Sequence, residues 1–83
     1  MLMWFLYIAQ CSDSSFYTGI SNDLEKRLKE HNSGKASKYT RARLPVAFVY
    51  IEELDSKSKA LKREAEVKRL NRIQKEQLVE KRQ

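Results

Sequence analysis

An almost unbroken apolar run near the amino terminus constrains this fold more than any other feature. The run extends from Met3 to Gln10 (MWFLYIAQ) and is rich in the aromatic and β-branched residues that favour strands. Polar and apolar residues do not alternate along it, so we expect a strand that other elements cover on both faces. The run is far too short to cross a bilayer.

Turn-forming and helix-capping residues divide the rest of the chain. The segment 12–15 (SDSS) predicts a turn, after which a second strand from Phe16 to Ile20 would form an antiparallel hairpin with the first. Asn22 and Glu25 have the spacing of a capping box at the start of a helix. The remaining expected elements are a helix from Asp23 to about His31, a polar basic loop from Lys35 to Arg43, a strand from Val46 to Glu53, a helix from Lys57 to Leu70 and a last helix from about Arg72 to Lys81.

The order β-β-α-β-α-α predicts an α+β fold with a small three-stranded antiparallel sheet flanked by helices. Eighty-three residues are enough for one domain, which we expect to span residues 1–83. The single cysteine, Cys11, excludes an intrachain disulfide and a Cys/His metal cluster. The amino terminus lacks the pattern of a signal peptide, so we expect a cytoplasmic protein. We also expect a monomer.

The charge of the chain favours a polyanionic partner. Lys and Arg number 17 against 11 Asp and Glu, which gives a net charge of +6 at pH 7. This balance favours nucleic acid over a membrane surface as the partner.

Glu64 is a carboxylate at a helical position where the pattern calls for an apolar side chain. In a helix from Lys57 to Leu70, the apolar stripe consists of Ala60, Leu61, Ala65, Val67 and Leu70, and Glu64 projects from its middle. An ionised carboxylate that is buried there needs a cation, either Arg, Lys or a metal. The alternatives are that Glu64 reaches the rim of the stripe or pairs with a core Arg.

Four further residues are candidates for a site. Arg27 and His31 lie four residues apart on the first helix, along the flank of the side that Leu24 marks as buried. Tyr7 and Tyr17 add phenolic hydroxyls on adjacent strands. The structural alternatives are a salt bridge from Arg27 to Glu64 and a His31 cation favoured by the helix dipole.

These residues together resemble the GIY-YIG nuclease superfamily. The first motif corresponds to Phe5-Leu6-Tyr7, and the second to Tyr17-Thr18-Gly19. The family carries an Arg ten residues after its second tyrosine, which is Arg27 here, and a Tyr or His four residues later, which is His31. The metal-binding glutamate of the next helix corresponds to Glu64.

The resemblance is strongest to small stand-alone bacterial members, because their run is similar to residues 30–41 (EHNSGKASKYTR). The chain departs from the pattern at several positions. It lacks the glycine of the first motif, and Thr18 stands where the second motif has isoleucine. Ile20 stands where some members have a lysine. Glu76 occupies the place of an asparagine that members often have. Asn71 would lie on the face of Glu64 if that helix continued so far.

The resemblance implies a divalent-metal-dependent endonuclease that hydrolyses phosphodiester bonds in DNA, with DNA favoured over RNA. Mg²⁺ or Mn²⁺ on Glu64 would polarise the phosphate, and Arg27 would bind a non-bridging oxygen. Either Tyr7 or His31 would accept the proton of the attacking water, with Tyr17 orienting that water. We favour Tyr7, so that Tyr7→Phe would be more damaging than His31→Ala.

The basic loop is the expected substrate grip, since its cations suit phosphates and its one ring suits stacking on a base. Its candidate residues are Lys35, Lys38, Tyr39, Arg41 and Arg43. The alternative is a solvated loop. A chain of this size has no evident module for reading a DNA sequence. We therefore expect branched, nicked or flapped DNA as the substrate and a role in DNA repair. The alternative function is a non-catalytic or very slow nucleic-acid-binding module that retains the nuclease fold.

Overall fold

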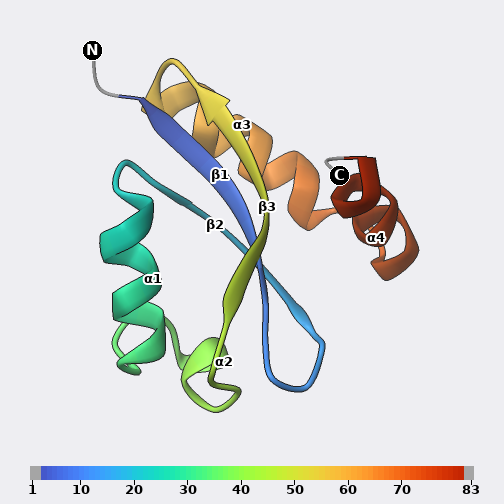
Figure 1. Cartoon of the computed structure of the whole chain (residues 1–83). Coiled ribbons are helices and arrows are strands. Elements are labelled where there is room, and N and C mark those ends of the chain that lie inside the picture. Colours follow the sequence, from blue (N-terminus) through green and yellow to red (C-terminus); the bar gives the residue numbers. More distant parts are fainter. Residues whose placement is uncertain (1–2, 82–83) are drawn as a thin grey trace.

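The protein has an α+β fold built on a three-stranded antiparallel sheet (Figure 1). A computed structural model describes residues 3–81. The strand β1 (Trp4–Gln10) lies between β2 (Phe16–Ser21) and β3 (Ala47–Leu54) and pairs antiparallel with both. The predicted fold class and element order are therefore confirmed, and the strand boundaries agree with the sequence to within one residue.

The central strand is covered on both faces, as its uninterrupted apolar pattern predicted. Leu6 and Ile8 are fully buried and pack with Val67 in one cluster. Tyr7 and Ala9 point to the opposite face and belong to a second cluster. The alternation of side chains along a strand thus divides one apolar run between two cores.

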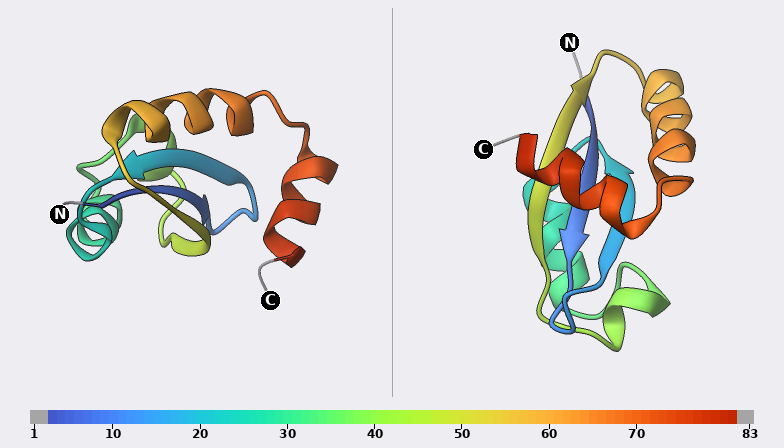
Figure 2. Two further views of the ribbon diagram at one scale, coloured as in Figure 1. Left: turned by 90° about the horizontal axis from the view of Figure 1, so that it is seen from above. Right: turned by 90° about the vertical axis from the view of Figure 1, so that its right-hand side faces the viewer.

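The helices are distributed over these two faces (Figure 2). Leucines of α1 (Leu24–Asn32) pack on the cluster that contains Tyr7. The helices α3 (Lys57–Lys68) and α4 (Arg72–Lys81) supply the other cover, since their apolar residues pack with Leu6 and Ile8. Within residues 3–81 no helix has the length and apolar character needed to span a membrane.

The first helix begins one residue later than the sequence suggested. The N-cap is Asp23, whose Oδ1 accepts a hydrogen bond from the backbone N–H of Lys26 at 3.1 Å. The predicted capping box at Asn22 is therefore wrong, because the adjacent Asp23 takes the capping position. The helix ends in a Schellman motif: Gly34 has a φ of 81°, and the N–H groups of Gly34 and Lys35 donate to the carbonyls of His31 and Glu30.

The expected basic loop contains a short helix, α2 (Lys38–Arg41). Its N-cap is Ser37, whose hydroxyl oxygen accepts from the backbone N–H of Thr40 at 3.0 Å. Arg43 also ties the segment down, because it donates to the Asp13 carboxylate and to the Tyr39 carbonyl. The expectation of a flexible arm from Lys35 to Arg43 is corrected accordingly.

The helix α3 packs through a narrower face than its sequence pattern suggested. Ala60 and Val67 are fully buried, whereas Leu61 is 47% exposed and Ala65 is also exposed. Glu64 lies on the same side of the helix as Ala60 and Val67, at spacings of four and three residues. The predicted apolar edge at Leu61 and Ala65 is therefore wrong, because the sheet covers only one strip of the helix.

The helix α3 ends at Lys68, two residues earlier than predicted. Asn71 instead caps α4, since its Oδ1 accepts from the backbone N–H of Gln74 at 2.9 Å while the Gln74 side chain accepts from the Asn71 N–H. Asn71 consequently does not continue the helical face of Glu64.

A carboxylate–guanidinium clamp attaches α3 to the sheet. Two nitrogens of Arg63 donate to the two oxygens of Glu52, each at 2.9 Å, and a third contact reaches Glu66. These hydrogen bonds raise the pKa of Arg63. Bidentate pairing restricts the rotation of α3 against β3 and so helps to set the direction in which Glu64 projects.

Candidate active site

The candidate site lies around Tyr7, at the side of the sheet where β2 forms an edge. Tyr7 of β1 pairs with Gly19 of β2, and its ring lies across that glycine. A β-carbon on Gly19 would come within 2.5 Å of the Tyr7 hydroxyl oxygen. The glycine of the second motif therefore provides the space in which the tyrosine of the first motif lies.

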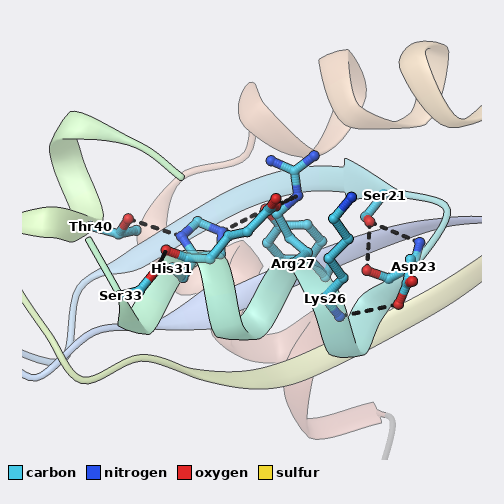
Figure 3. A network of polar contacts seen from close by, with 9 residues as sticks. Ser21, Asp23, Lys26, Arg27, His31, Ser33 and Thr40 are labelled. Atoms are coloured by element: carbon cyan, nitrogen blue, oxygen red, sulfur yellow. Dashed lines mark hydrogen bonds and ion pairs between the residues drawn. The ribbon is translucent and has the colours of Figure 1, made fainter. Parts of the chain in front are cut away.

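A line of hydrogen bonds runs from Tyr7 through His31 to Thr40. The Tyr7 hydroxyl lies 2.8 Å from His31 Nε2, and His31 Nδ1 lies 2.9 Å from Thr40 Oγ1. All three residues are buried, with exposed fractions of 2%, 1% and 0%. Figure 3 shows His31 turned toward Thr40, with Arg27 projecting from the same helix.

The contacts of Thr40 fit an Nδ1–H tautomer of His31. The Thr40 hydroxyl lies 3.4 Å from the Ser37 carbonyl, to which it can donate, and 3.1 Å from the Ser37 hydroxyl, so its oxygen can accept a hydrogen bond from His31 Nδ1–H. A neutral imidazole carries one proton. His31 Nε2 is then an acceptor, and the Tyr7 hydroxyl is the donor in their hydrogen bond.

Burial keeps both members of the pair uncharged. Desolvation raises the pKa of Tyr7 above its ordinary value of 10.0, and the nearby Tyr17 raises it further while Arg27 opposes the shift. Desolvation also lowers the pKa of His31 below 6.5, and Arg27 lowers it further. At neutral pH the site therefore contains a phenol and a neutral imidazole, and Tyr7 has no resting phenolate.

Tyr17 lies beside this pair. Its ring centroid is 5.4 Å from that of His31 and 6.5 Å from that of Tyr7. Unlike Tyr7, Tyr17 is only half-buried. On its other side it lies nearly parallel to the Tyr39 ring, with the centroids 6.2 Å apart. Tyr7, Tyr17, His31 and Tyr39 thus form an aromatic group, in which Tyr17 lies between the buried pair of Tyr7 and His31 and the surface.

Arg27 is close enough to act electrostatically on both Tyr7 and His31. Its Nε is 3.5 Å from a carboxylate oxygen of Glu30, on the same helix. That nitrogen is buried and has no hydrogen-bond partner among the described residues. The Arg27 side chain is 37% exposed, so its terminal nitrogens could take a further acceptor such as a phosphate oxygen.

Glu64 is partnered by a lysine of its own helix and not by a core arginine. Its carboxylate lies 3.3 Å from the ammonium of Lys68, and the two side chains are 20% and 53% exposed. Glu64 also contributes to the raised pKa of Tyr7. The structural alternative of a salt bridge between Arg27 and Glu64 is not the arrangement observed, since Arg27 pairs with Glu30.

The donor set around Glu64 fits an ion that keeps most of its water. Within residues 3–81 no group of three His, Cys, Asp or Glu side chains could enclose a metal. Mg²⁺ is commonly bound through one or two carboxylates together with waters and substrate phosphates. A partly exposed carboxylate that faces only a half-exposed ammonium meets that requirement, so Glu64 could hold such an ion.

The basic residues of the loop fall into two groups. Lys35, Lys38 and Arg41 are exposed. Arg43 is occupied in the fold, since it pairs with Asp13 at 3.1 Å and lies 3.9 Å over the Tyr39 ring. Tyr39 consequently has one face covered by Arg43, and its ring is less available for stacking than the sequence suggested.

A groove of about 250 Å³ adjoins these residues on the β2 side. The residues that line it come from β2, α2, α3 and α4, and they are Phe16, Tyr17, Thr18, Tyr39, Lys68 and Lys75. The sequence did not indicate Lys68 and Lys75 as site residues, because their pattern is that of exposed charges on amphipathic helices. It also missed Thr40: the Ser37-x-x-Thr40 spacing is a signal for a helix cap but does not reveal the contact with His31.

Comparison with known proteins identifies the family. Residues 3–77 match the family model that is described as "GIY-YIG catalytic domain". The chain belongs to the GIY-YIG family. Nucleases of this family generally depend on divalent metals, and a nuclease domain implies nucleic-acid binding.

The relatives include bacterial and archaeal proteins of similar size. A UPF0213 protein of Haloquadratum walsbyi is 50% identical over 76 residues, which are 92% of this chain and 85% of the relative. A UPF0213 protein of Bacillus cereus is 52% identical over 75 residues, 90% of this chain and 78% of the relative. The GIY-YIG resemblance is therefore confirmed across nearly the whole chain.

Two solution NMR structures have the same fold. A UPF0213 protein from Bacillus halodurans has a TM-score of 0.61 at 46% identity and covers 94% of this chain and 83% of its own. A protein from E. faecalis has a TM-score of 0.65 at 42% identity, and the match covers 95% of this chain and 84% of that protein's chain.

Proposed function

We propose that this GIY-YIG protein is a divalent-metal-dependent endonuclease that hydrolyses phosphodiester bonds in DNA. The observation that carries the proposal is the hydrogen-bonded line from Tyr7 through His31 to Thr40. A positioned base, a guanidinium and a carboxylate are the parts that phosphodiester hydrolysis requires.

Tyr7 and His31 act as one proton relay in this proposal. The oxygen of a water molecule attacks phosphorus and the P–O3′ bond breaks. The proton of the water moves to the Tyr7 oxygen, and the Tyr7 proton moves to His31 Nε2. His31 becomes an imidazolium whose Nδ1–H still donates to Thr40. The relay reconciles the raised pKa of Tyr7 with a role as proton acceptor, because no phenolate need form.

Arg27 and Glu64 supply the charges. Arg27 pairs with Glu30 through Nε at 3.5 Å, its side chain is 37% exposed, and its terminal nitrogens would donate to a non-bridging phosphate oxygen. Glu64 would hold Mg²⁺ or Mn²⁺, and the ion would polarise the phosphate and stabilise the leaving 3′ oxygen. Tyr17, half-buried between the pair and the surface, would orient the water.

The net charge of +6 and the exposed cations of the loop support nucleic acid as the substrate, and DNA is the class that we propose. Branched, nicked or flapped DNA is the preferred class, since the candidate site offers no element of the size that reads a groove. A monomer in the cytoplasm is the proposed acting form.

A cleavage assay tests this function. Purified protein is incubated with branched, flapped and single-stranded DNA and with RNA, each with Mg²⁺, Mn²⁺ or EDTA. We expect divalent-dependent cleavage of DNA, with Tyr7→Phe more damaging than His31→Ala and the double variant no worse than Tyr7→Phe, because residues of one relay are not additive. Additive losses would contradict the relay.

The second candidate is a nucleic-acid-binding module without significant activity. The burial of Tyr7 and His31 to 2% and 1% exposure favours it, since a hydrogen-bonded buried pair also stabilises a core. Binding without cleavage on every substrate and ion of the same assay would support this module and exclude the endonuclease.

A further inference from the structure

Lys68 belongs both to the groove beside the candidate site and to the ion pair of Glu64, the carboxylate that would hold the metal. Lys68 forms part of the groove wall, and its ammonium lies 3.3 Å from Glu64. The wall also contains Lys75 from α4 and the rings of Tyr17 and Tyr39. The groove is therefore contiguous with both the aromatic group and Glu64.

Lys68 lies beside the carboxylate that would hold the divalent ion. Its ammonium is 3.3 Å from Glu64, and the side chains of Lys68 and Glu64 are 53% and 20% exposed. Two cations at contact distance from one carboxylate repel each other. An ion that binds Glu64 therefore favours departure of the ammonium, which the flexible four-carbon chain of lysine permits.

We propose that Lys68 is an exchangeable cation, which neutralises Glu64 when no metal is bound and binds a backbone phosphate in the adjacent groove once a divalent ion takes its place. The proposal rests on the function proposed above. The occupant of the groove is one nucleotide of the bound strand next to the scissile phosphate, and Lys75 is the second phosphate ligand.

The groove suits this occupant in charge and composition. Two lysines offer positive charge, while the half-buried ring of Tyr17 offers aromatic surface to a sugar or base. The volume of about 250 Å³ is on the scale of one nucleotide and too small for a duplex.

The exchange makes metal and nucleic acid bind cooperatively. Without metal, Lys68 is engaged by Glu64 and contributes little to phosphate binding. With metal, the repelling charge of Glu64 is neutralised and the ammonium is available. Coupling of this kind is reciprocal, so nucleic acid must also tighten the binding of the ion.

Lys68→Gln tests the proposal, with Lys62→Gln as the matched control because Lys62 is an exposed lysine of the same helix. Oligonucleotide affinity is measured by fluorescence anisotropy in EDTA and in Ca²⁺, with the integrity of the DNA checked on a gel. Mn²⁺ affinity without DNA is measured by electron paramagnetic resonance.

In EDTA we expect the two variants to lose the same small factor in DNA affinity. In Ca²⁺ we expect Lys68→Gln to lose about fivefold more than Lys62→Gln, the lower end of typical coupling. Mn²⁺ should bind Lys68→Gln more tightly than the wild type, because a competing cation is gone. Equal losses in Ca²⁺, or unchanged Mn²⁺ affinity, would overturn the proposal.

Glu64→Gln separates this inference from the proposed function. If Glu64→Gln abolishes Mn²⁺ binding while Lys68→Gln and Lys62→Gln behave alike, the metal site stands and only the exchange is wrong. If Mn²⁺ binds equally well to wild type and Glu64→Gln, the metal assignment itself is wrong and the exchange fails with it.

Discussion

The hydroxyl of Tyr7 occupies the space that a side chain on Gly19 would need. The two residues are paired across β1 and β2, and a β-carbon at Gly19 would lie 2.5 Å from the Tyr7 oxygen and 2.7 Å from its ring carbon. The two motifs of the family thus form one structural unit, in which the glycine permits the tyrosine to reach His31.

Gly19→Ala should therefore displace the Tyr7 ring. Overpacking of this kind costs about 1–3 kcal/mol of unfolding free energy. The hydrogen bond to His31 should also be lost, so cleavage should fall even where the protein remains folded. Thermal unfolding and cleavage measured on the same preparation check this, and a folded Gly19→Ala protein with wild-type activity would contradict it.

Thr40 should act through its oxygen and not through its size. Thr40→Val leaves His31 Nδ1–H without an acceptor, which should cost about 1–3 kcal/mol of stability. It should also shift the imidazole away from the Nδ1–H tautomer, as read from ¹⁵N chemical shifts. Thr40→Ser keeps the oxygen and is the matched control, so it should retain the tautomer. Equal spectra for the two variants would exclude the positioning role.

Acidification should destabilise the protein through His31. Its pKa in the folded protein lies below the 6.5 of the unfolded chain, because burial and Arg27 disfavour the cation. Between these two pKa values the unfolded chain binds more protons, so stability is fully present above pH 6.5 and decreases as the pH falls below it. Melting temperatures between pH 5 and 7.5 should show this slope, and His31→Gln should make it shallower.

The exposed loop cations should bind phosphates, whereas Arg43 should stabilise the fold. Replacing Lys35, Lys38 and Arg41 with Gln should weaken binding for all sequences. The slope of log affinity against log salt should become shallower by about 0.7–0.9 for each phosphate that the variant no longer binds. Arg43→Gln should instead lower the melting temperature, since Arg43 holds Asp13 and Tyr39. Unchanged affinity of the triple variant at low salt would place the substrate elsewhere.

The sequence predicted the fold wherever local pattern and burial agree. The run from Met3 to Gln10 required two covered faces, and the structure divides it between two cores. The N-cap was misplaced because Asn22 and Asp23 are adjacent and both can cap. The short helix α2 was missed because its four residues carry no apolar periodicity.

The candidate site was predictable as a set of residues but not as a geometry. Motif spacing selected Tyr7, Arg27, His31 and Glu64, yet it did not indicate that the tyrosine and histidine share a hydrogen bond. The contact of His31 with Thr40 joins two segments across a helix end, and no periodicity encodes such contacts. Likewise, the choice of Lys68 as the partner of Glu64 depends on side-chain rotamers.

The most direct measurement is divalent-dependent cleavage by Glu64→Gln, with Glu66→Gln as the control on the same helix. Glu64→Gln should abolish cleavage in Mg²⁺ and Mn²⁺ while the melting temperature changes little, because its partner Lys68 is half-exposed and such pairs are worth about 0–1 kcal/mol. Glu66→Gln should keep its activity. A folded Glu64→Gln protein that cleaves at the wild-type rate would contradict the assignment of Glu64 as the metal ligand.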